Sequence, residues 1–196
     1  MHHRVKNNLQ IIASLLHFQA KRVRDPADLA AFADGRDRLR AMILVHEKLY
    51  QSRDLSRIDF GNYLRSLVRD LQHSHSAGGR RMDVKVSAAA VGLPIQLAVP
   101  SGMILCELLT NVFKYAFPHE KTGAVTVSLT AEGALVRLCV EDNGVGLPSG
   151  FDPHNSSTFG WRLIRNLTAQ LGGEVSIDRR EGTRVAIVFT NEAGRS

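Results

Sequence analysis

Three polar side chains recur at helical spacing within an otherwise apolar stretch of the sequence. Glu107 precedes Asn111 by four residues, and Lys114 follows Asn111 by three, with Tyr115 directly after it. Residues three and four apart share one face of a helix, so these groups lie together if the segment is helical. A carboxylate and an amide oxygen suit Mg²⁺ with its waters, and a lysine suits phosphate. An ordinary solvated helix face explains the same pattern equally well.

A second polar group follows an apolar strand, where Asp142 is succeeded by Gly144 and Gly146. An aspartate at a strand end can accept a hydrogen bond from the amino group of a base, while glycines let the backbone approach a ligand closely. The pattern alone is also common in turns. Its position after a strand and downstream of the polar helix face favours a binding site.

Small hydroxyl residues and Gly160 open the next helical stretch, in the run Ser156-Ser157-Thr158-Phe159-Gly160. The backbone N–H groups at a helix N-terminus can bind an anion, although serine and threonine are also frequent as simple helix caps. Thr183, just before the last strand, offers one more hydroxyl near that region.

Two adjacent histidines lie at the beginning of an apolar-periodic helix. A heptad seam runs through Val5, Leu9, Ile12 and Leu16. Extending this seam backward places His2 toward the core and His3 toward solvent. Asn7 is four residues after His3 and shares its face. A neutral imidazole nitrogen can attack phosphorus when a hydrogen bond orients the other ring nitrogen. His3 is therefore the candidate phosphate acceptor, with Asn7 as its orienting neighbour.

The elements that must position these groups divide the chain in two. Apolar periodicity predicts helices on either side of Arg24–Asp28, because Pro26 ends one helix and suits the first turn of the next. The polar loop His73–Gly79 is the expected domain boundary. The prediction is a helical domain over residues 1–75 and a second domain over residues 76–196.

The first two helices are expected to form an antiparallel hairpin with wide apolar faces, since Ile11, Leu15 and Phe18 extend the heptad seam sideways. A lone hairpin cannot bury both faces. Pairing with a second copy into a four-helix bundle would bury them, so a homodimer is predicted. The alternative is a hairpin packed against the second half of its own chain.

Strand and helix patterns alternate in the second half, and residues 94–100 are expected to be a connection. A helix is also predicted just before the polar loop His73–Gly79, from the helical spacing of Phe60, Leu64, Leu67, Val68 and Leu71. Further helices are expected at 103–115 and 161–171, and strands at 82–87, 124–129, 135–140, 174–178 and 184–189. Strands with segregated helices favour an α+β fold built as a two-layer sandwich.

Composition narrows the function classes. The 196 residues carry a net charge of +6, but the basic residues are scattered and no aromatic stripe accompanies them, so nucleic-acid binding is a minority interpretation. No apolar run approaches the roughly 20 residues of a membrane span, and no secretory leader is visible. Two cysteines in apolar surroundings, Cys106 and Cys139, favour reduced thiols and a cytoplasmic location.

The order of these motifs resembles the ATP-binding domain of the GHKL superfamily, the Bergerat fold of histidine kinases, gyrase and Hsp90, over about residues 80–190. The resemblance implies that Asn111 holds Mg²⁺, that Asp142 reads the adenine amino group, and that Glu107 and Lys114 support metal and phosphate. It implies a mobile lid over ATP from Leu147 to Phe159. The remaining nucleotide-binding candidates are Tyr115, Gly144, Gly146, Gly160 and Thr183.

The segment His3-Arg4-Val5-Lys6-Asn7 resembles the acceptor box of histidine kinases with a His-Arg-x-x-Asn motif, the HWE kinases and their close relatives. The HWE subgroup carries a Trp-x-Glu sequence, whereas Trp161 is followed by Arg162 and Leu163, so relatives without that signature fit better. Other kinases carry two or more glycines where this chain has only Gly160, which weakens the expected phosphate cradle.

Together the resemblances imply a kinase core that autophosphorylates His3 from Mg-ATP and passes the phosphoryl group to an aspartate of a response regulator. His3, Asn7 and Glu107 are the candidate catalytic residues. Arg4 stands where many kinases carry an acidic residue, so the proton acceptor is unassigned. Two other interpretations remain open: an ATP-inactive phosphotransfer protein of the same architecture, and a basic nucleic-acid-binding module.

Overall fold

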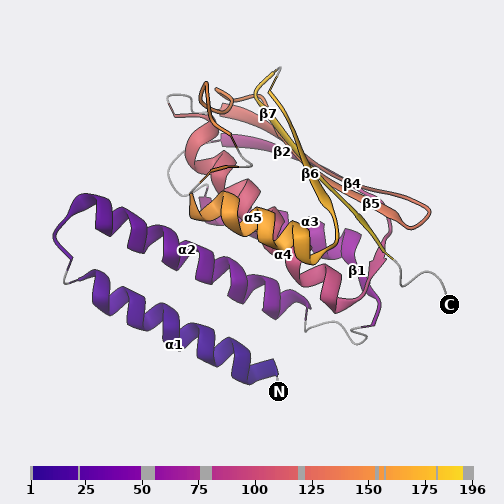
Figure 1. Ribbon diagram of the computed structural model, residues 1–196. Helices are drawn as coiled ribbons and strands as arrows, with labels where there is room; N and C mark the ends of the chain where they lie inside the picture. The colour runs from indigo at the N-terminus through magenta and orange to yellow at the C-terminus, as the bar shows by residue number, and fades with distance from the viewer. Residues whose placement is uncertain are drawn as a thin grey trace. The chain divides into compact units, whose positions relative to one another are not determined.

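The computed structural model describes residues 2–21, 23–49, 56–75, 81–118, 122–152, 155–156, 158–179 and 181–191, without the side chains of residues 2–6, 17, 27, 30 and 81. The chain divides into two compact units, residues 1–53 and 54–196. Figure 1 shows the helices of the first unit and the sheet with its own helices in the second.

Within its described residues, the first unit is a hairpin of helices α1 (His2–Ala20) and α2 (Pro26–Leu49), which run side by side. Pro26 is the first residue of α2, a position that requires no backbone N–H donor. The Asp25 carboxylate accepts a hydrogen bond from the Asp28 N–H at 3.2 Å and caps the helix. The predicted hairpin and its turn are confirmed.

The two sides of α1 differ in exposure. Leu16 lies over Gly35 of α2 and is half-buried, as the heptad seam predicts. Ile12 continues the same seam and is 45% exposed in the single chain, so its burial by a second hairpin stays a prediction. One neighbouring helix covers only a narrow stripe of α1. The large apolar residues beside that stripe stay exposed, namely Ile11, Leu15 and Phe18.

The second unit is a two-layer α/β sandwich. Within the described residues its sheet has five strands in the order β2-β4-β5-β7-β6, with β2 parallel to β4 and the other neighbours antiparallel. The strands are β2 (Arg81–Ala88), β4 (Thr122–Glu132), β5 (Leu135–Asp142), β6 (Glu174–Asp178) and β7 (Thr183–Thr190). Helices α3 (Phe60–His75), α4 (Ile95–Asn111) and α5 (Phe159–Gln170) lie on one face of the sheet (Figure 1). The predicted α+β class is confirmed.

Helix α3 is part of the second unit by its contacts. Its predicted apolar stripe is buried against the sheet layer and α4. The Arg65 guanidinium donates to the Ala88 carbonyl at 2.6 Å, and the Gln72 amide donates to the Met82 carbonyl at 2.9 Å. Just before α3, β1 (Ile58–Asp59) pairs with β3 (Gly92–Leu93). These contacts fasten residues 58–75 to the sheet domain, while the boundary expected between residues 75 and 76 stays a prediction.

Several predicted element ends are wrong. The segment 94–100 was expected to be a connection, but α4 already begins at Ile95, with the extended Pro94 in front of it. Pro100 lies inside the helix and lacks the N–H for one hydrogen bond, but its neighbours Ala98 and Ser101 are fully buried, and their packing offsets the loss. Likewise α3 continues to His75, so His73–His75 are helical rather than part of a loop.

The other end of α4 also differs from the prediction. The helix expected to continue to residue 115 is α-helical only to Asn111, and Val112–Ala116 form a π-helical turn, η2. A π turn has i→i+5 hydrogen bonds and occurs often at functional sites. In this turn the hydrogen-bonded neighbours are therefore five residues apart in the sequence, instead of four as in an α-helix.

The same stretch corrects the expectation about membrane-length segments. By length and mean hydropathy alone, Ile95–Ala116 reaches what a membrane span requires, although no such run was expected. Most of this segment is buried within the second unit, where α4 packs against α3, α5 and β5. The apolar composition of this segment is therefore explained by its packing in the core of the second unit.

Candidate functional site

The side chain of Asp142 is buried because of its place in β5. Alternate residues of a strand face the same side, and Val136, Leu138 and Val140 all point into the helical layer. Asp142 is next in this row at the strand end and is only 5% exposed. Its Oδ1 accepts a hydrogen bond from the Gly144 N–H at 2.9 Å. The alternation of the strand therefore buries the Asp142 carboxylate at the end of β5.

Burial raises the pKa of the Asp142 carboxyl above its usual value. Hydrogen bonds from the backbone N–H groups of Gly144 and Thr183 act in the opposite direction, and the nearby Glu141 charge adds to the increase. Thr183 is the residue paired with Asp142 across the β5–β7 ladder. The carboxyl is thus desolvated and oriented, which is the state in which it can discriminate between hydrogen-bonding partners.

The loop after Asp142 packs tightly on the end of η2. The Val145 N–H donates to the Ala116 carbonyl at 2.8 Å. Gly144 leaves no room for a side chain, since a Cβ there would overlap the Ala116 carbonyl oxygen. Gly146 has φ +74°, a conformation that favours glycine. The glycines predicted from the sequence therefore serve two different needs: close packing at Gly144 and backbone conformation at Gly146.

The polar residues of α4 and η2 end beside this loop. Glu107 is 4% exposed and makes interactions within the fold, and Asn111 is half-buried. Beyond them, within the π turn, Lys114 is half-buried and Tyr115 is 61% exposed. Because Ala116 ends the same turn, the structure brings this polar segment next to the Asp142 loop.

Gly160 is the second residue of α5, and Thr158 precedes the helix in an extended conformation without a side-chain capping hydrogen bond. The Thr158 hydroxyl lies 2.9 Å from the Ser156 hydroxyl instead. The helix N-terminus suits an anion, but its place relative to Asp142 was not predicted by the sequence.

The segment predicted as a lid is attached at several points in its described part. The Phe151 and Trp161 rings lie 5.8 Å apart, and the Arg179 guanidinium donates to the Phe151 carbonyl at 2.6 Å. Arg165 donates to the Ser156 carbonyl at 3.1 Å. Residues 153, 154 and 157 of this segment lie outside the described residues. Sequence reasoning missed these attachments because they join residues distant in the chain.

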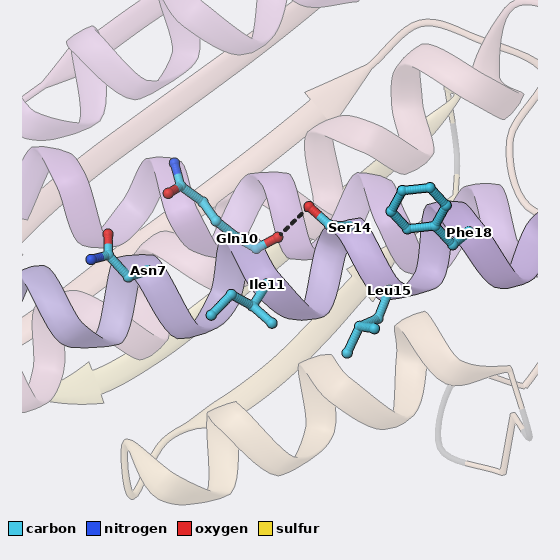
Figure 2. Close-up of a pocket in the computed structure, with 6 residues that line it drawn as sticks. All are labelled: Asn7, Gln10, Ile11, Ser14, Leu15 and Phe18. Carbon is cyan, nitrogen blue, oxygen red and sulfur yellow. Dashed lines mark hydrogen bonds between the residues drawn. The ribbon is translucent and has the colours of Figure 1, made fainter.

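The candidate phosphate acceptor belongs to the other compact unit. His3 lies on α1, and its side chain is outside the described part of the structure. Asn7 is exposed on α1, four residues after His3, and its side chain is drawn in Figure 2. The structure therefore places His3 and Asn7 on one helix and the nucleotide-binding candidates in the sheet domain.

The side chains of Asn111 and Glu107 suit a Mg²⁺ ion whose remaining ligands are waters and substrate phosphates. Within the described residues, no group of three or more His, Cys, Asp or Glu side chains comes together. Mg²⁺ commonly keeps several waters and takes only one or two protein ligands plus substrate phosphates. The half-buried Asn111 amide, one helical turn from the buried Glu107, is such a sparse set.

Two family profiles match most of the chain. Residues 1–75 match the profile described as "Histidine kinase", and residues 99–193 match the one described as "Histidine kinase-, DNA gyrase B-, and HSP90-like ATPase". The predicted resemblance to both parts of a histidine kinase core is confirmed. The second match contains α5, β5 and β7, and thus the loop that follows Asp142.

Individual relatives agree with the profiles. The chain is 30% identical over 186 residues to "Blue-light-activated histidine kinase 2" of Erythrobacter litoralis, covering 90% of this chain and 51% of that protein. It is 31% identical over 191 residues to "Sensor histidine kinase PdtaS" of Mycobacterium tuberculosis, covering 95% of this chain and 38% of the relative. The chain thus spans about half the length of these relatives or less.

Solved structures give the same result. The histidine kinase domain of the Erythrobacter litoralis EL346 blue-light activated histidine kinase superposes with a TM-score of 0.71 at 25% identity, covering 93% of this chain and 96% of that one. The Acinetobacter baumannii histidine kinase AdeS shares the fold with a TM-score of 0.57 at 14% identity, over 95% of this chain and 96% of that one. With the profiles, the relatives and the buried aspartate of a GHKL-type ATPase domain in agreement, the chain belongs to the histidine kinase family.

Proposed function

We propose that the chain is an ATP-dependent protein histidine kinase that phosphorylates His3 and passes the phosphoryl group to an aspartate of a response-regulator receiver domain. The observation that supports this most directly is the buried Asp142 carboxylate, oriented by the Gly144 N–H at a strand end. The Gly144 and Thr183 N–H groups hold the carboxylate, and its remaining lone pairs can accept a hydrogen bond from the adenine amino group.

The remaining candidate residues are assigned to the metal ion and the phosphates. Asn111 holds Mg²⁺, with Glu107 buried one helical turn before it, and Lys114 neutralises phosphate charge. Tyr115 is exposed, and its ring can cover the nucleotide. The other nucleotide contacts are assigned to Gly144, Gly146, Gly160 and Thr183.

Phosphoryl transfer requires a nucleophile placed in line with the leaving group. One ring nitrogen of His3 attacks the γ-phosphorus, so that an N–P bond forms while the P–O bond to ADP breaks. Asn7 can orient the imidazole but cannot accept its proton usefully. Arg4 and Lys6 give the acceptor an electropositive setting for the incoming phosphate. The proton from the imidazole leaves to a group outside this motif.

Labelling with radioactive ATP and Mg²⁺ tests the acceptor. We expect acid-labile, base-stable label on the parent protein and on His2→Gln, and at least about a hundredfold less on His3→Gln, because only one histidine attacks phosphorus. The His2 variant is the matched control, since it changes the neighbouring residue in the same way. Equal labelling of parent and His3→Gln would overturn the assignment of His3.

We further propose a homodimer formed through the exposed face of α1. Figure 2 shows this face, along which the apolar Ile11, Leu15 and Phe18 lie beside the polar Asn7, Gln10 and Ser14. Each of the three apolar side chains is more than half exposed in the single chain. A second hairpin packed on them would complete a four-helix bundle and remove this surface from water.

Charge introduced on this face is expected to prevent dimer formation. The double variant Leu15→Glu and Phe18→Glu would place two carboxylates in the apolar interface, so we expect a monomer by light scattering and sedimentation. Gln170→Glu adds a carboxylate at an exposed position of α5, outside the proposed interface, and should remain dimeric. A parent protein that is monomeric at every concentration would contradict the homodimer.

The cytoplasm is the proposed location, because Cys106 and Cys139 are both buried free thiols. The alternative function, an ATP-inactive phosphotransfer protein, rests on the single glycine at the start of α5. Calorimetric titration with ATP and Mg²⁺ separates the two: measurable affinity supports the kinase, and its absence supports the phosphotransfer protein.

A further inference from the structure

Gly182 lies in the turn between β6 and β7, directly before Thr183. Its φ is +78°, in the left-handed region that favours glycine. From the sequence, Thr183 is a possible hydroxyl ligand, whereas no role is predicted for Gly182 itself. Its surroundings in the structure differ from those of an ordinary turn glycine.

The turn packs directly on the main chain of Asp142. A Cβ at position 182 would overlap the Asp142 carbonyl oxygen and approach the Cα of Asn143 at 3.0 Å. Two other glycines with positive φ, Gly133 (+60°) and Gly172 (+61°), would have nothing within 4 Å of such a Cβ. The close approach is therefore specific to position 182 and is not a general property of glycine turns in this fold.

The opposite side of the same loop is held by η2. Gly144 packs on the Ala116 carbonyl, and the Val145 N–H donates to that oxygen at 2.8 Å. Gly146 lies against the β6–β7 turn: a Cβ at position 146 would be 3.3 Å from the Gly182 carbonyl oxygen. The backbone from residue 142 to 146 is thus enclosed between the end of η2 and the β6–β7 turn.

We propose that Gly182 is a positioning residue for Asp142: by packing without a side chain against the Asp142 carbonyl, it fixes the main chain from which the base-reading carboxylate projects. This inference rests on the proposed function for its link to adenine. Gly182 acts through Asp142 and the paired Thr183, not through a contact of its own with nucleotide. A side chain at position 182 displaces the start of the loop and with it the carboxylate that accepts the Gly144 N–H.

The test compares the affinities for ATP and inosine triphosphate, which carries a carbonyl oxygen where adenine carries its amino group. A carboxylate accepts a hydrogen bond from the amino group and repels the carbonyl, so the parent is expected to prefer ATP. Gly182→Ala should reduce the preference about tenfold or more, the size of one charge-assisted hydrogen bond. Gly182→Asn should do the same, since asparagine tolerates positive φ and leaves mainly the steric overlap.

Gly133→Ala and Gly172→Ala are the matched controls. Each places a Cβ at a positive φ and carries the same backbone strain, but in open space. Both should retain the parent's preference for ATP. A merely unstable variant would lose affinity for both nucleotides alike, so the ratio distinguishes misplacement of Asp142 from general loss of structure.

A second measurement does not require nucleotide. The Gly144 amide should exchange its hydrogen faster in the Gly182 variants than in the controls, because its bond to the Asp142 carboxylate is lost. Parent-like selectivity and parent-like exchange in both Gly182 variants would overturn the inference, as would equal losses in the controls. A parent that does not prefer ATP, but whose Gly144 exchange responds to Gly182→Ala, would reject the adenine assignment and retain the positioning role.

Discussion

A chain cut to residues 76–196 is expected to lose its cooperative fold, whereas one cut to residues 54–196 keeps it. The two differ by α3, which buries a stripe of large apolar side chains against α4 and the sheet: Phe60, Leu64, Leu67, Val68 and Leu71. Each such side chain stabilises the fold by roughly 1.5–3 kcal/mol. Removing the stripe takes away on the order of 10 kcal/mol, similar to the entire net stability of an ordinary domain.

Urea unfolding followed by circular dichroism measures this difference. The longer fragment should show one cooperative transition, and the shorter one none, since it also loses the hydrogen bonds from Arg65 to β2 and from Gln72 to Met82. Leu67 is fully buried, so Leu67→Asp in the longer fragment should also lower the free energy of unfolding. Equal stability of the two fragments would instead favour a domain boundary between residues 75 and 76.

Asp142→Asn is expected to weaken ATP binding while leaving the fold as stable as before, or more so. The adenine amino group would lose a hydrogen bond to a charged acceptor, which corresponds to roughly a 10- to 100-fold loss in affinity. Calorimetric titration with ATP and Mg²⁺ measures that loss. Asp83→Asn is the matched control, because Asp83 is exposed on β2 of the same sheet.

The pKa of Asp142 gives the sign of the stability effect. Burial raises this pKa, so the folded state binds a proton more readily than the unfolded state does. Stability contributed by this residue is therefore highest below the ordinary carboxyl pKa and falls as pH rises through the raised value. Asparagine carries no charge, so the variant should gain on the parent in thermal midpoint as pH increases through that interval. A variant that is less stable than the parent at neutral pH would contradict this account.

Local chemistry explains why much of the candidate site could be predicted. Asp142 and the two following glycines form a recognisable pattern because a strand end, a turn and close backbone approach each require particular residue types at adjacent positions. The helical hairpin was predictable for the same reason, since Pro26 determines where one helix ends and the next begins. Periods of two and 3.6 residues then gave the order of strands and helices.

Burial against distant segments decided the features that the sequence left open. Pro100 argued for a connection, yet α4 runs through it because the neighbouring residues are enclosed by other elements. The π turn after Asn111, the membership of α3 in the sheet domain, and the place of Gly182 each depend on contacts across long stretches of sequence.

The sequence by itself determined the family, the α+β class and the residues with suitable chemistry, because these follow from residue types at short spacing. Only the tertiary structure decided how Asp142 is held. Its carboxylate is buried by the alternation of β5, its loop rests on Ala116 at the end of η2, and its carbonyl is packed on Gly182 from the β6–β7 turn. Ala116 and Gly182 are both far from Asp142 in sequence, and their steric packing against its loop exists only once the sheet has formed.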